Sequence, residues 1–517
     1  MRLASVAFFA LGLTLGPGSV GWLCPRAMAA ETARIPLAGE WRFQLDRGDA
    51  GVTERWFERP LEQRLKLPGA LQNQGFGDDI TVDTKWTGEV GVDAWLKGPQ
   101  YAKYRGPGNI KVPFFLQPEK HYVGAAWYQR VVDVPAAWHG KRVVLRLERA
   151  HWETRVWLDS REIGTNTSLS TPHSYDLGTG LEPGKHTLTV RVDNRMIVNV
   201  GPWAHSVTDH TQGNWNGMIG GLELLATSPV WIEEAQVYPN VASKSVLVKV
   251  RIGNASGKAG HGTLTIGLRS KPVDWDDKGG TAEVEVPLGK DAKTWDEFDP
   301  TLQTLLIRLT GAQADDRRTV TFGLREIGAE GKEFVLNGRK TLFRGTLECC
   351  IFPLTGYPPT DVQSWKRVIR ACKAYGLNLI RFHSWCPPEA AFVAADELGF
   401  YFQVVRCLVQ PWREQGPGSV ALRGERAHRE GLRQPPFVRA AHARQRAAWQ
   451  GPRYVSGRVG QLLEATRLAP PGHQRLGLPA TPRESVPRLC GGTRAAWLAG
   501  QGLPQRRAGA DGARHRA

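Results

Sequence analysis

The chain has 517 residues, 41% of them hydrophobic, and a formal net charge of +17. This length suggests about three domains, and the apolar content is enough for real cores, which excludes a wholly disordered chain. Residues 405–517 hold 20 Arg, no Lys and six acidic residues, which accounts for +14 of this charge. The rest of the chain carries only +3, so the net charge gives no reason to expect a specific nucleic-acid partner.

Residues 1–29 are typical of a secretory signal peptide. One Arg precedes an apolar stretch, and Ala27-Met28-Ala29 matches an A-x-A cleavage site. The break at Gly16-Pro17-Gly18 argues against a membrane-spanning helix, the alternative being an anchor that stays uncleaved. No later segment is long and apolar enough to span a bilayer. We therefore expect a secreted or periplasmic protein with no membrane span after signal cleavage.

Residues 30–228 predict a jelly-roll β-sandwich. Short runs rich in Val and aromatic residues, such as AWYQRVVDVP (126–135) and KRVVLRLERAHWETRVWLDSREIG (141–164), are bounded by turn residues that include Asp159-Ser160. In TLTVRV (187–192) apolar and polar residues alternate, which predicts one buried face and one solvent-facing face. Short strands at this spacing favour two packed sheets.

Residues 229–328 predict a second, immunoglobulin-like β-sandwich. About 100 residues is the usual length of such a domain. Its strand-like runs are WIEEAQVYPNVASKSVLVKVRIGN, GTLTIGLRS, GTAEVEVPL, LQTLLIRLT and TVTFGLRE.

Residues 329–404 predict the first three strands of a (β/α)8 barrel. A hairpin turning at Asn337-Gly338 leads into a candidate buried strand, TLFRGTLE (341–348). A helix capped by Thr360 or Asp361 and ended by Gly376 comes next, followed by the strand LNLIRFH. A second helix, opened by Pro387-Pro388 and ended by Gly399, precedes the strand FYFQVV. Such alternation with short loops means parallel strands.

Residues 405–517 break this pattern. They contain no Lys, Ile, Asn or Met and are rich in Arg, Ala, Gly and Pro. The missing residue types share AT-rich codons rather than a physical property, which favours a GC-rich gene read in the wrong frame; the alternative is a native, disordered, basic tail. In either case we expect a segment of low order that does not complete a barrel.

Five segments together resemble glycoside hydrolase family 2, which includes β-galactosidases, β-glucuronidases and β-mannosidases. The resemblance covers residues 34–404 and implies a jelly-roll sugar-binding domain, an immunoglobulin-like domain and a catalytic barrel. It implies an O-glycosyl hydrolase with a carbohydrate partner, and it sets no oligomeric state. The segments are PLAGEWRFQLD, VWLDSREIG with LEPGKHTLTVRVDN, TQGNWNGMIGGLEL, FVLNGRKTLFRGT and GLNLIRFHSWCPPEAAFVAADELGFYFQV.

The family's chemistry needs two carboxylates, and this sequence is not expected to supply them. Retaining glycosidases use an acid/base and a nucleophile about 5–5.5 Å apart. In the family the acid/base Glu follows an Asn at the end of the fourth barrel strand, and the nucleophile ends the seventh. Residues 405–517 contain no Asn, so we expect no catalytic residue and an inactive, truncated or frame-shifted chain. The alternative function is a non-catalytic carbohydrate-binding or adhesion module.

The candidate sugar-binding residues of the barrel are Arg381, His383, Trp385 and Glu348. The first three end the second strand, at the face where barrel active sites form, and Glu348 ends the first. A guanidinium suits a carboxylate, an imidazole suits hydroxyls, and an indole suits a sugar face. The alternatives are that Arg381 and His383 brace the rim and that Glu348 is a salt-bridged rim carboxylate.

Asn214, Trp215 and Asn216 are a second candidate group, on a sandwich loop that family members extend toward the barrel mouth. Amides beside an aromatic ring suit hydroxyl-rich ligands. The alternative is a set of turn residues with a packed indole.

No metal or other cofactor is expected. Cys349, Cys372, His383 and Cys386 are a conceivable ligand set, but no C-x-x-C spacing occurs and buried thiols are the favoured interpretation.

Overall fold

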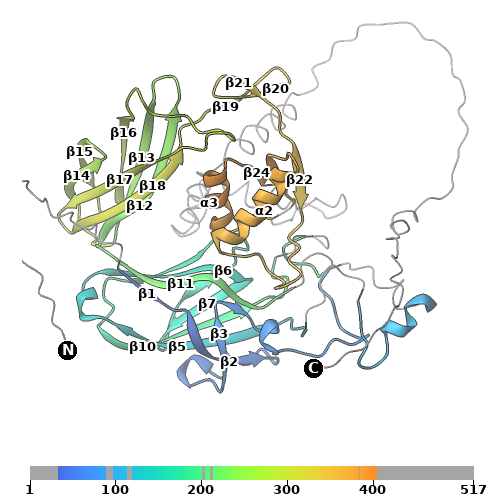
Figure 1. Ribbon diagram of the computed structural model, residues 1–517. Helices are drawn as coiled ribbons and strands as arrows, with labels where there is room; N and C mark the ends of the chain where they lie inside the picture. The colour runs from blue at the N-terminus through green and yellow to red at the C-terminus, as the bar shows by residue number, and fades with distance from the viewer. Residues whose placement is uncertain are drawn as a thin grey trace, which may run out of the picture. The chain divides into compact units, whose positions relative to one another are not determined.

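The computed structural model describes residues 33–88, 97–112, 119–198, 200, 204–209, 214–383 and 385–404. All of them belong to one compact unit of the chain; a second unit, Ala465–Ala517, lies outside the described residues, as do the expected signal peptide and the segment from residue 405 onward. The described strands form five sheets (Figure 1). In this part of the chain no helix is long and apolar enough to cross a membrane.

The first two sheets form what we call the N-terminal sandwich, residues 33–227. One sheet has the order β1-β11-β6-β9, with β4 paired to β11, and the other has the order β3-β2-β5-β10-β7-β8. The first comprises β1 (Ala33–Pro36), β4 (Gly69–Ala70), β6 (Arg142–His151), β9 (His173–Gly178) and β11 (Gly217–Thr227). The second comprises β2 (Gly39–Asp46), β3 (Gln63–Leu67), β5 (Ala125–Val134), β7 (Glu153–Leu158), β8 (Arg161–Asn166) and β10 (Gly184–Asp193).

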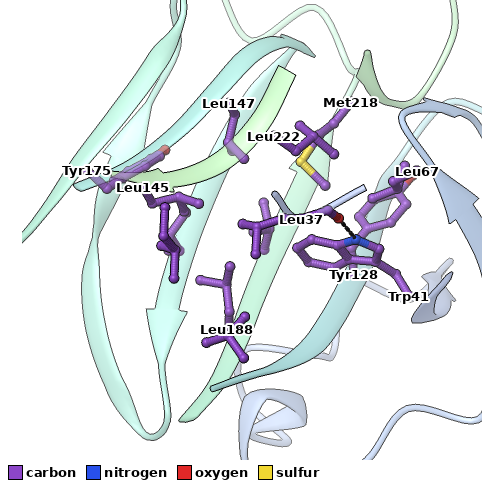
Figure 2. Close-up of a cluster of buried hydrophobic side chains, with 14 of the residues drawn as sticks. Leu37, Trp41, Leu67, Tyr128, Leu145, Leu147, Tyr175, Leu188, Met218 and Leu222 are labelled. Carbon is purple, nitrogen blue, oxygen red and sulfur yellow. Dashed lines mark hydrogen bonds between the residues drawn. The ribbon is translucent and has the colours of Figure 1, made fainter. Parts of the chain in front are cut away.

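Side chains from both sheets meet in one core (Figure 2). Leu145 of β6 and Leu188 of β10 are fully buried there, and the indole N–H of Trp41 donates to the carbonyl oxygen of Leu37 at 2.7 Å. Among the described residues of this region four short 3₁₀ helices connect strands, and the turn expected at Asp159-Ser160 joins β7 to β8. The 3₁₀ helices are Trp56–Glu58, Gln72–Gln74, Pro99–Tyr104 and Ala136–Trp138.

The expectation that β10 has a solvent-facing side was wrong. Thr189 is fully buried and Arg191 is 7% exposed, although both alternate with core residues. The segment between β2 and β3 folds over this outer face and brings Trp56 and Phe57 onto Trp127 and Trp157. Periodicity within β10 could not reveal a cover that comes from about 140 residues earlier in the chain.

The third sheet forms the middle β domain, residues 230–323. Its order is β15-β14-β17-β18-β12-β13-β16, and its two antiparallel parts meet at a single parallel pair, Val230 with Ala314. Strand β15 was not expected as a separate strand. The strands are β12 (Val230–Asn240), β13 (Ser245–Asn254), β14 (Gly260–Ile266), β15 (Arg269–Trp275), β16 (Gly279–Pro287), β17 (Leu302–Gly311) and β18 (Ala314–Gly323).

The fourth sheet is a short meander that leads into the fifth. Strands β19 (Ile327–Glu330), β20 (Glu333–Leu336) and β21 (Arg339–Thr341) pair in that order. The expected hairpin turn is confirmed, because Asn337 and Gly338 both have positive φ between β20 and β21.

The fifth sheet and its two helices form the parallel unit, residues 345–404. Strands β22 (Gly345–Glu348), β23 (Leu379–Phe382) and β24 (Tyr401–Val404) are parallel, as expected from the strand–helix alternation. Helices α2 (Val362–Ala374) and α3 (Glu389–Leu398) connect them and share one core with the sheet. Asp361 caps α2 by accepting the N–H of Ser364 at 2.7 Å, and Gly399 ends α3 with φ of 63°.

The expectation of a buried first strand was wrong for β22. Thr346 and Leu347 are exposed, Leu347 to 53%. The helices pack on the face that carries Ile380 and Phe382, which leaves Leu347 on the uncovered face. Thr346 pairs with Ile380 on the helix side and is exposed as well, because β22 is the edge strand and the helices do not reach over it.

Candidate functional site

The C-terminal end of the parallel sheet presents Arg381 on its open face. The strand register aligns Leu347, Arg381 and Gln403 in one row across β22, β23 and β24. Ile380 and Phe382, which flank Arg381, lie in the core with the helices. Because side chains alternate along a strand, Arg381 projects from the opposite face, and it is exposed. Its guanidinium is therefore positioned to meet an anionic or hydroxyl-bearing ligand.

Glu348 is held by backbone groups rather than by a cation. Its carboxylate accepts the N–H groups of Cys350 at 2.9 Å and Ile351 at 3.3 Å. Burial raises the pKa of Glu348 to about 7, and these N–H donors oppose that rise without cancelling it. A carboxyl with this pKa exists in both protonation states at neutral pH. These partners differ from the salt bridge considered as the alternative, and a sugar contact of Glu348 stays a prediction.

His383 lies where β23 ends and contacts a histidine of the N-terminal sandwich. Its backbone N–H donates to the carbonyl oxygen of Glu348 at 2.8 Å, which ties the ends of β22 and β23 together. Its Nδ1 lies 3.1 Å from Nδ1 of His205, and the two ring centroids are 4.4 Å apart. The imidazole of His383 therefore stands at the junction of the two regions.

Trp385 packs inside the parallel unit. It is 4% exposed, and its ring meets Phe382 edge-to-face at 5.2 Å and Phe352 at 5.9 Å. Its indole N–H points to the carbonyl oxygen of Glu348 at 3.4 Å. This environment favours a packing role over stacking on a sugar.

Asn214 and Asn216 serve the framework of the N-terminal sandwich. Asn216 is fully buried: its amide oxygen accepts the hydroxyl of Tyr128 at 2.7 Å, and its amide nitrogen donates to the carbonyl oxygen of Gly124 at 3.0 Å. The Asn214 amide nitrogen donates to the carbonyl oxygen of Asn194 at 2.9 Å, while its amide oxygen is buried without a partner. These contacts favour the alternative considered for this loop.

Trp215 connects the N-terminal sandwich to the parallel unit. Its ring stacks on His151 at 4.8 Å and meets Tyr357, in the loop after β22, at 5.4 Å. The indole is 5% exposed, and its N–H is buried without an acceptor.

The two described loops of the parallel unit, after β22 and after β23, are held by the N-terminal sandwich. In the β22–α2 loop, the carbonyl oxygen of Thr355 accepts the side-chain N–H of Asn73 at 3.0 Å. After β23, the carbonyl oxygen of Cys386 accepts Nη1 of Arg149 at 3.0 Å, and Glu389 lies 3.3 Å from Nη2 of Arg146. The candidate residues thus stand at an interface between two regions.

Sequence reasoning missed His205, Arg149 and Tyr357. Each lies in a segment whose sequence is typical of an ordinary strand or loop. Its importance comes from a contact with a residue more than 100 positions away in the chain. Among the described residues, no group of three or more His, Cys, Asp or Glu side chains is arranged to hold a metal ion. The conceivable Cys/His ligand set therefore has no counterpart in this part of the structure.

Residues 35–227 match the family model described as glycosyl hydrolases family 2, sugar binding domain. Among curated relatives, a beta-glucuronidase of Paenibacillus borealis is 23% identical over 335 residues, covering 60% of this chain and 48% of the relative. A beta-galactosidase of Arthrobacter sp. (strain B7) is 23% identical over 407 residues, covering 75% of this chain and 36% of the relative. The chain thus spans about half of these relatives' length or less.

Solved structures share the fold. A GH2 beta-galacturonidase from Eisenbergiella tayi bound to galacturonate superposes with a TM-score of 0.53 at 18% identity, covering 73% of this chain and 59% of that one. A b-glucuronidase from Ruminococcus gnavus in complex with D-glucuronic acid also gives 0.53 at 18% identity, covering 72% and 60%. The comparisons therefore identify residues 35–227 as a sugar-binding domain of the glycoside hydrolase family 2 type and show that the described fold is shared with solved members of that family.

Proposed function

We propose that this chain is the sugar-recognising part of an exported glycoside hydrolase that acts on β-linked glycosides by a retaining mechanism. The single observation that carries the proposal is the exposed Arg381 at the end of β23, beside loops held by the sugar-binding domain. In barrel enzymes this end of the parallel strands forms the active site. The A-x-A site at Ala27–Ala29 supports export.

The proposal includes an architecture. We assign the N-terminal sandwich to a jelly roll, the middle β domain to an immunoglobulin-like domain, and the parallel unit to the first three strands of a (β/α)8 barrel. The parallel pairing of β22 with β23 and of β23 with β24, each pair joined by a helix, supports the last assignment. Low order of residues 405–517 remains part of the same proposal.

We further propose that the chain with this sequence binds sugar without hydrolysing it. The supporting argument is compositional: residues 405–517 contain no Asn, so the family's Asn-Glu pair does not occur there. Without an acid/base and a facing nucleophile, a retaining mechanism cannot proceed. Glu348 does not substitute for either, because its oxygens face backbone N–H groups.

The sugar class proposed is a β-linked uronic acid. The relatives' names include beta-glucuronidase, and one structural neighbour is titled as bound to galacturonate. An exposed guanidinium suits a sugar carboxylate because it offers paired N–H donors. The rival function, an independent carbohydrate-binding module, is not favoured, since Asn214, Trp215 and Asn216 are buried in the framework.

Calorimetric titration of the purified chain with methyl β-D-glucuronide and methyl β-D-galactoside tests the proposal. We expect binding that favours the uronide and is lost in Arg381→Ala, while Arg269→Ala, at an exposed arginine of β15, leaves it unchanged. Incubation with 4-nitrophenyl β-glycosides should show no turnover above background. Uronide binding that survives Arg381→Ala, or clear turnover by the purified chain, would overturn the proposal.

A further inference from the structure

We propose that Arg149, on β6 of the sugar-binding domain, is a positioning residue that fixes Trp385–Pro388 and thereby sets His383 and Arg381 for sugar binding. The inference rests on the proposed function. It assigns the sugar-binding domain a structural part in a site that otherwise consists of residues from the parallel unit.

The guanidinium of Arg149 bridges two chain segments. Its Nη1 donates to the carbonyl oxygen of Cys386 at 3.0 Å, and its Nη2 donates to the carbonyl oxygen of Ser170, ahead of β9, at 3.3 Å. The planar fork of arginine fixes the angle between these two bonds, which a lysine ammonium cannot do. Arg149 therefore holds the Cys386 backbone at a defined place relative to the N-terminal sandwich.

A β-bulge explains why Arg149 reaches the parallel unit. Leu147 and Ala150 both lie in the sandwich core, so the in–out alternation of β6 slips by one residue between them. The slip lies opposite the register shift of β11 between Ile219 and Leu222. Bulges redirect side chains in this way, and here Arg149 points outward like Arg146, three residues earlier.

The segment after His383 needs an outside anchor. Pro387 and Pro388 have no N–H, so they cannot donate the hydrogen bonds that would fold the segment against its neighbours. Its two ends are already held by the N-terminal sandwich, through the 3.1 Å contact of His383 with His205 and the 3.3 Å ion pair of Glu389 with Arg146. Arg149 holds the middle.

The loss of a hydrogen bond from a charged donor weakens an interaction by roughly 10- to 100-fold. We expect Arg149→Lys to weaken uronide binding by about tenfold or more, because the ammonium cannot reproduce both bonds. Arg161→Lys is the matched control, since Arg161 donates to the carbonyl oxygen of Leu177 at 3.2 Å entirely within the N-terminal sandwich. The control should bind like the unchanged chain.

Two measurements on the full chain test the role: the Kd for methyl β-D-glucuronide, and hydrogen–deuterium exchange of peptides spanning 379–398. We expect Arg149→Lys to raise Kd and to speed exchange in these peptides only, and Arg161→Lys to do neither. Weaker binding with unchanged exchange would overturn the inference, because Arg149 would then act on the sugar directly. Faster exchange throughout the chain would overturn it as general destabilisation.

The proposed sugar binding and the positioning role of Arg149 can be disproved separately. If the unchanged chain binds no uronide, the proposed function is wrong, while the exchange experiment still decides whether Arg149 orders Trp385–Pro388. If the chain binds uronide and Arg149→Lys alters neither Kd nor exchange, the positioning role is wrong and the proposed function stands.

Discussion

In the N-terminal sandwich two sheets contribute to one core, whereas the parallel unit has its main core between one side of a single sheet and two helices, with a smaller cluster around Tyr401 on the other side. Leu145 and Leu188 are fully buried between opposite sheets, but Leu347, on the open face of β22, is 53% exposed. The groups with the largest pKa shifts in the acid range also differ: they are the histidines His151 and His173 in the sandwich, and the carboxyls Glu348 and Asp396 in the parallel unit. The two regions should therefore respond differently to mutation and in opposite directions to pH.

The largest expected effect is the loss of the parallel unit in Trp365→Ala. Trp365 of α2 is fully buried, contacts Phe382 and Trp385, and donates its indole N–H to the carbonyl oxygen of Pro359 at 2.8 Å. Truncating such a side chain costs about 3–5 kcal/mol. Because both helices pack on one face of a three-stranded sheet, the unit has little reserve, so we expect rapid proteolysis after residue 330 while the N-terminal sandwich survives.

Tyr375→Ala is the control for that experiment, because Tyr375 ends the same helix and is 87% exposed. It should leave the protease-resistant fragments unchanged. Equal resistance of Trp365→Ala and the unchanged chain would contradict the view that one core holds the parallel unit together.

Acid should weaken the N-terminal sandwich. Burial lowers the pKa of His173 to about 4, and its Nε2 lies 2.7 Å from the carbonyl oxygen of Ser168. Between pH 6.5 and about 4 the unfolded chain binds a proton that the folded chain excludes, so stability falls as pH falls through this window. The expected loss is about 3 kcal/mol.

His151 acts in the same direction, since burial also lowers its pKa to about 4, although the carbonyl oxygens of Trp215 and Ser206 oppose this. Urea unfolding at pH values between 7 and 4.5 measures the loss in free energy of unfolding. Hydrogen–deuterium exchange in β6 and β9 over the same pH range measures the loss locally. Nuclear magnetic resonance titration should place the pKa of both imidazoles well below the ordinary histidine range. Two midpoints near 6.5 would contradict the prediction.

The parallel unit should gain stability over part of the same pH range. Burial raises the pKa of Glu348 to about 7, so above pH 7 the buried carboxylate costs stability, and that cost disappears as pH falls from 7 toward 4.5. Burial likewise raises the pKa of Asp396 to about 6. Glu348 alone should contribute about 3 kcal/mol.

Glu348→Gln should remove this dependence, because an amide cannot ionise; its one oxygen still accepts the N–H of Cys350, while the longer bond from Ile351 to the other oxygen is lost. Exchange rates in β23 measured at pH 5 and pH 7.5, corrected for intrinsic exchange, should then become equal apart from the contribution of Asp396. Glu330→Gln, at an exposed position of β19, is the control. An unchanged pH dependence in Glu348→Gln would show that another group is responsible.

Short-range patterns in the sequence predicted turns and helix ends correctly. They could not predict contacts between segments that are distant in the chain. The cap at Asp361, the stop at Gly399 and the turn at Asn337-Gly338 depend on neighbouring residues and were found correctly. The burial of Thr189 depends on a segment about 140 residues away, so the alternation of apolar and polar residues in β10 predicted a solvent-facing side that does not exist. For the candidate site, the sequence indicated the end of β23 but not that Arg149 and His205 of another region reach it.

The smallest expected effect concerns the cap of α2 at Asp361, which depends only on neighbouring residues. Asp361→Ala removes the carboxylate that accepts the N–H of Ser364, at a cost of about 1 kcal/mol. Because that bond lowers the pKa of Asp361, its contribution is present above the ordinary aspartate pKa and fades as pH falls below it. Exchange in the first turn of α2 should therefore speed up at pH 7 and change little at pH 2.5, and Asp361→Asn, which keeps an acceptor, should recover most of the protection. If Asp361→Ala instead loosened β23 or the N-terminal sandwich, the cap would be part of the long-range network that sequence reading missed.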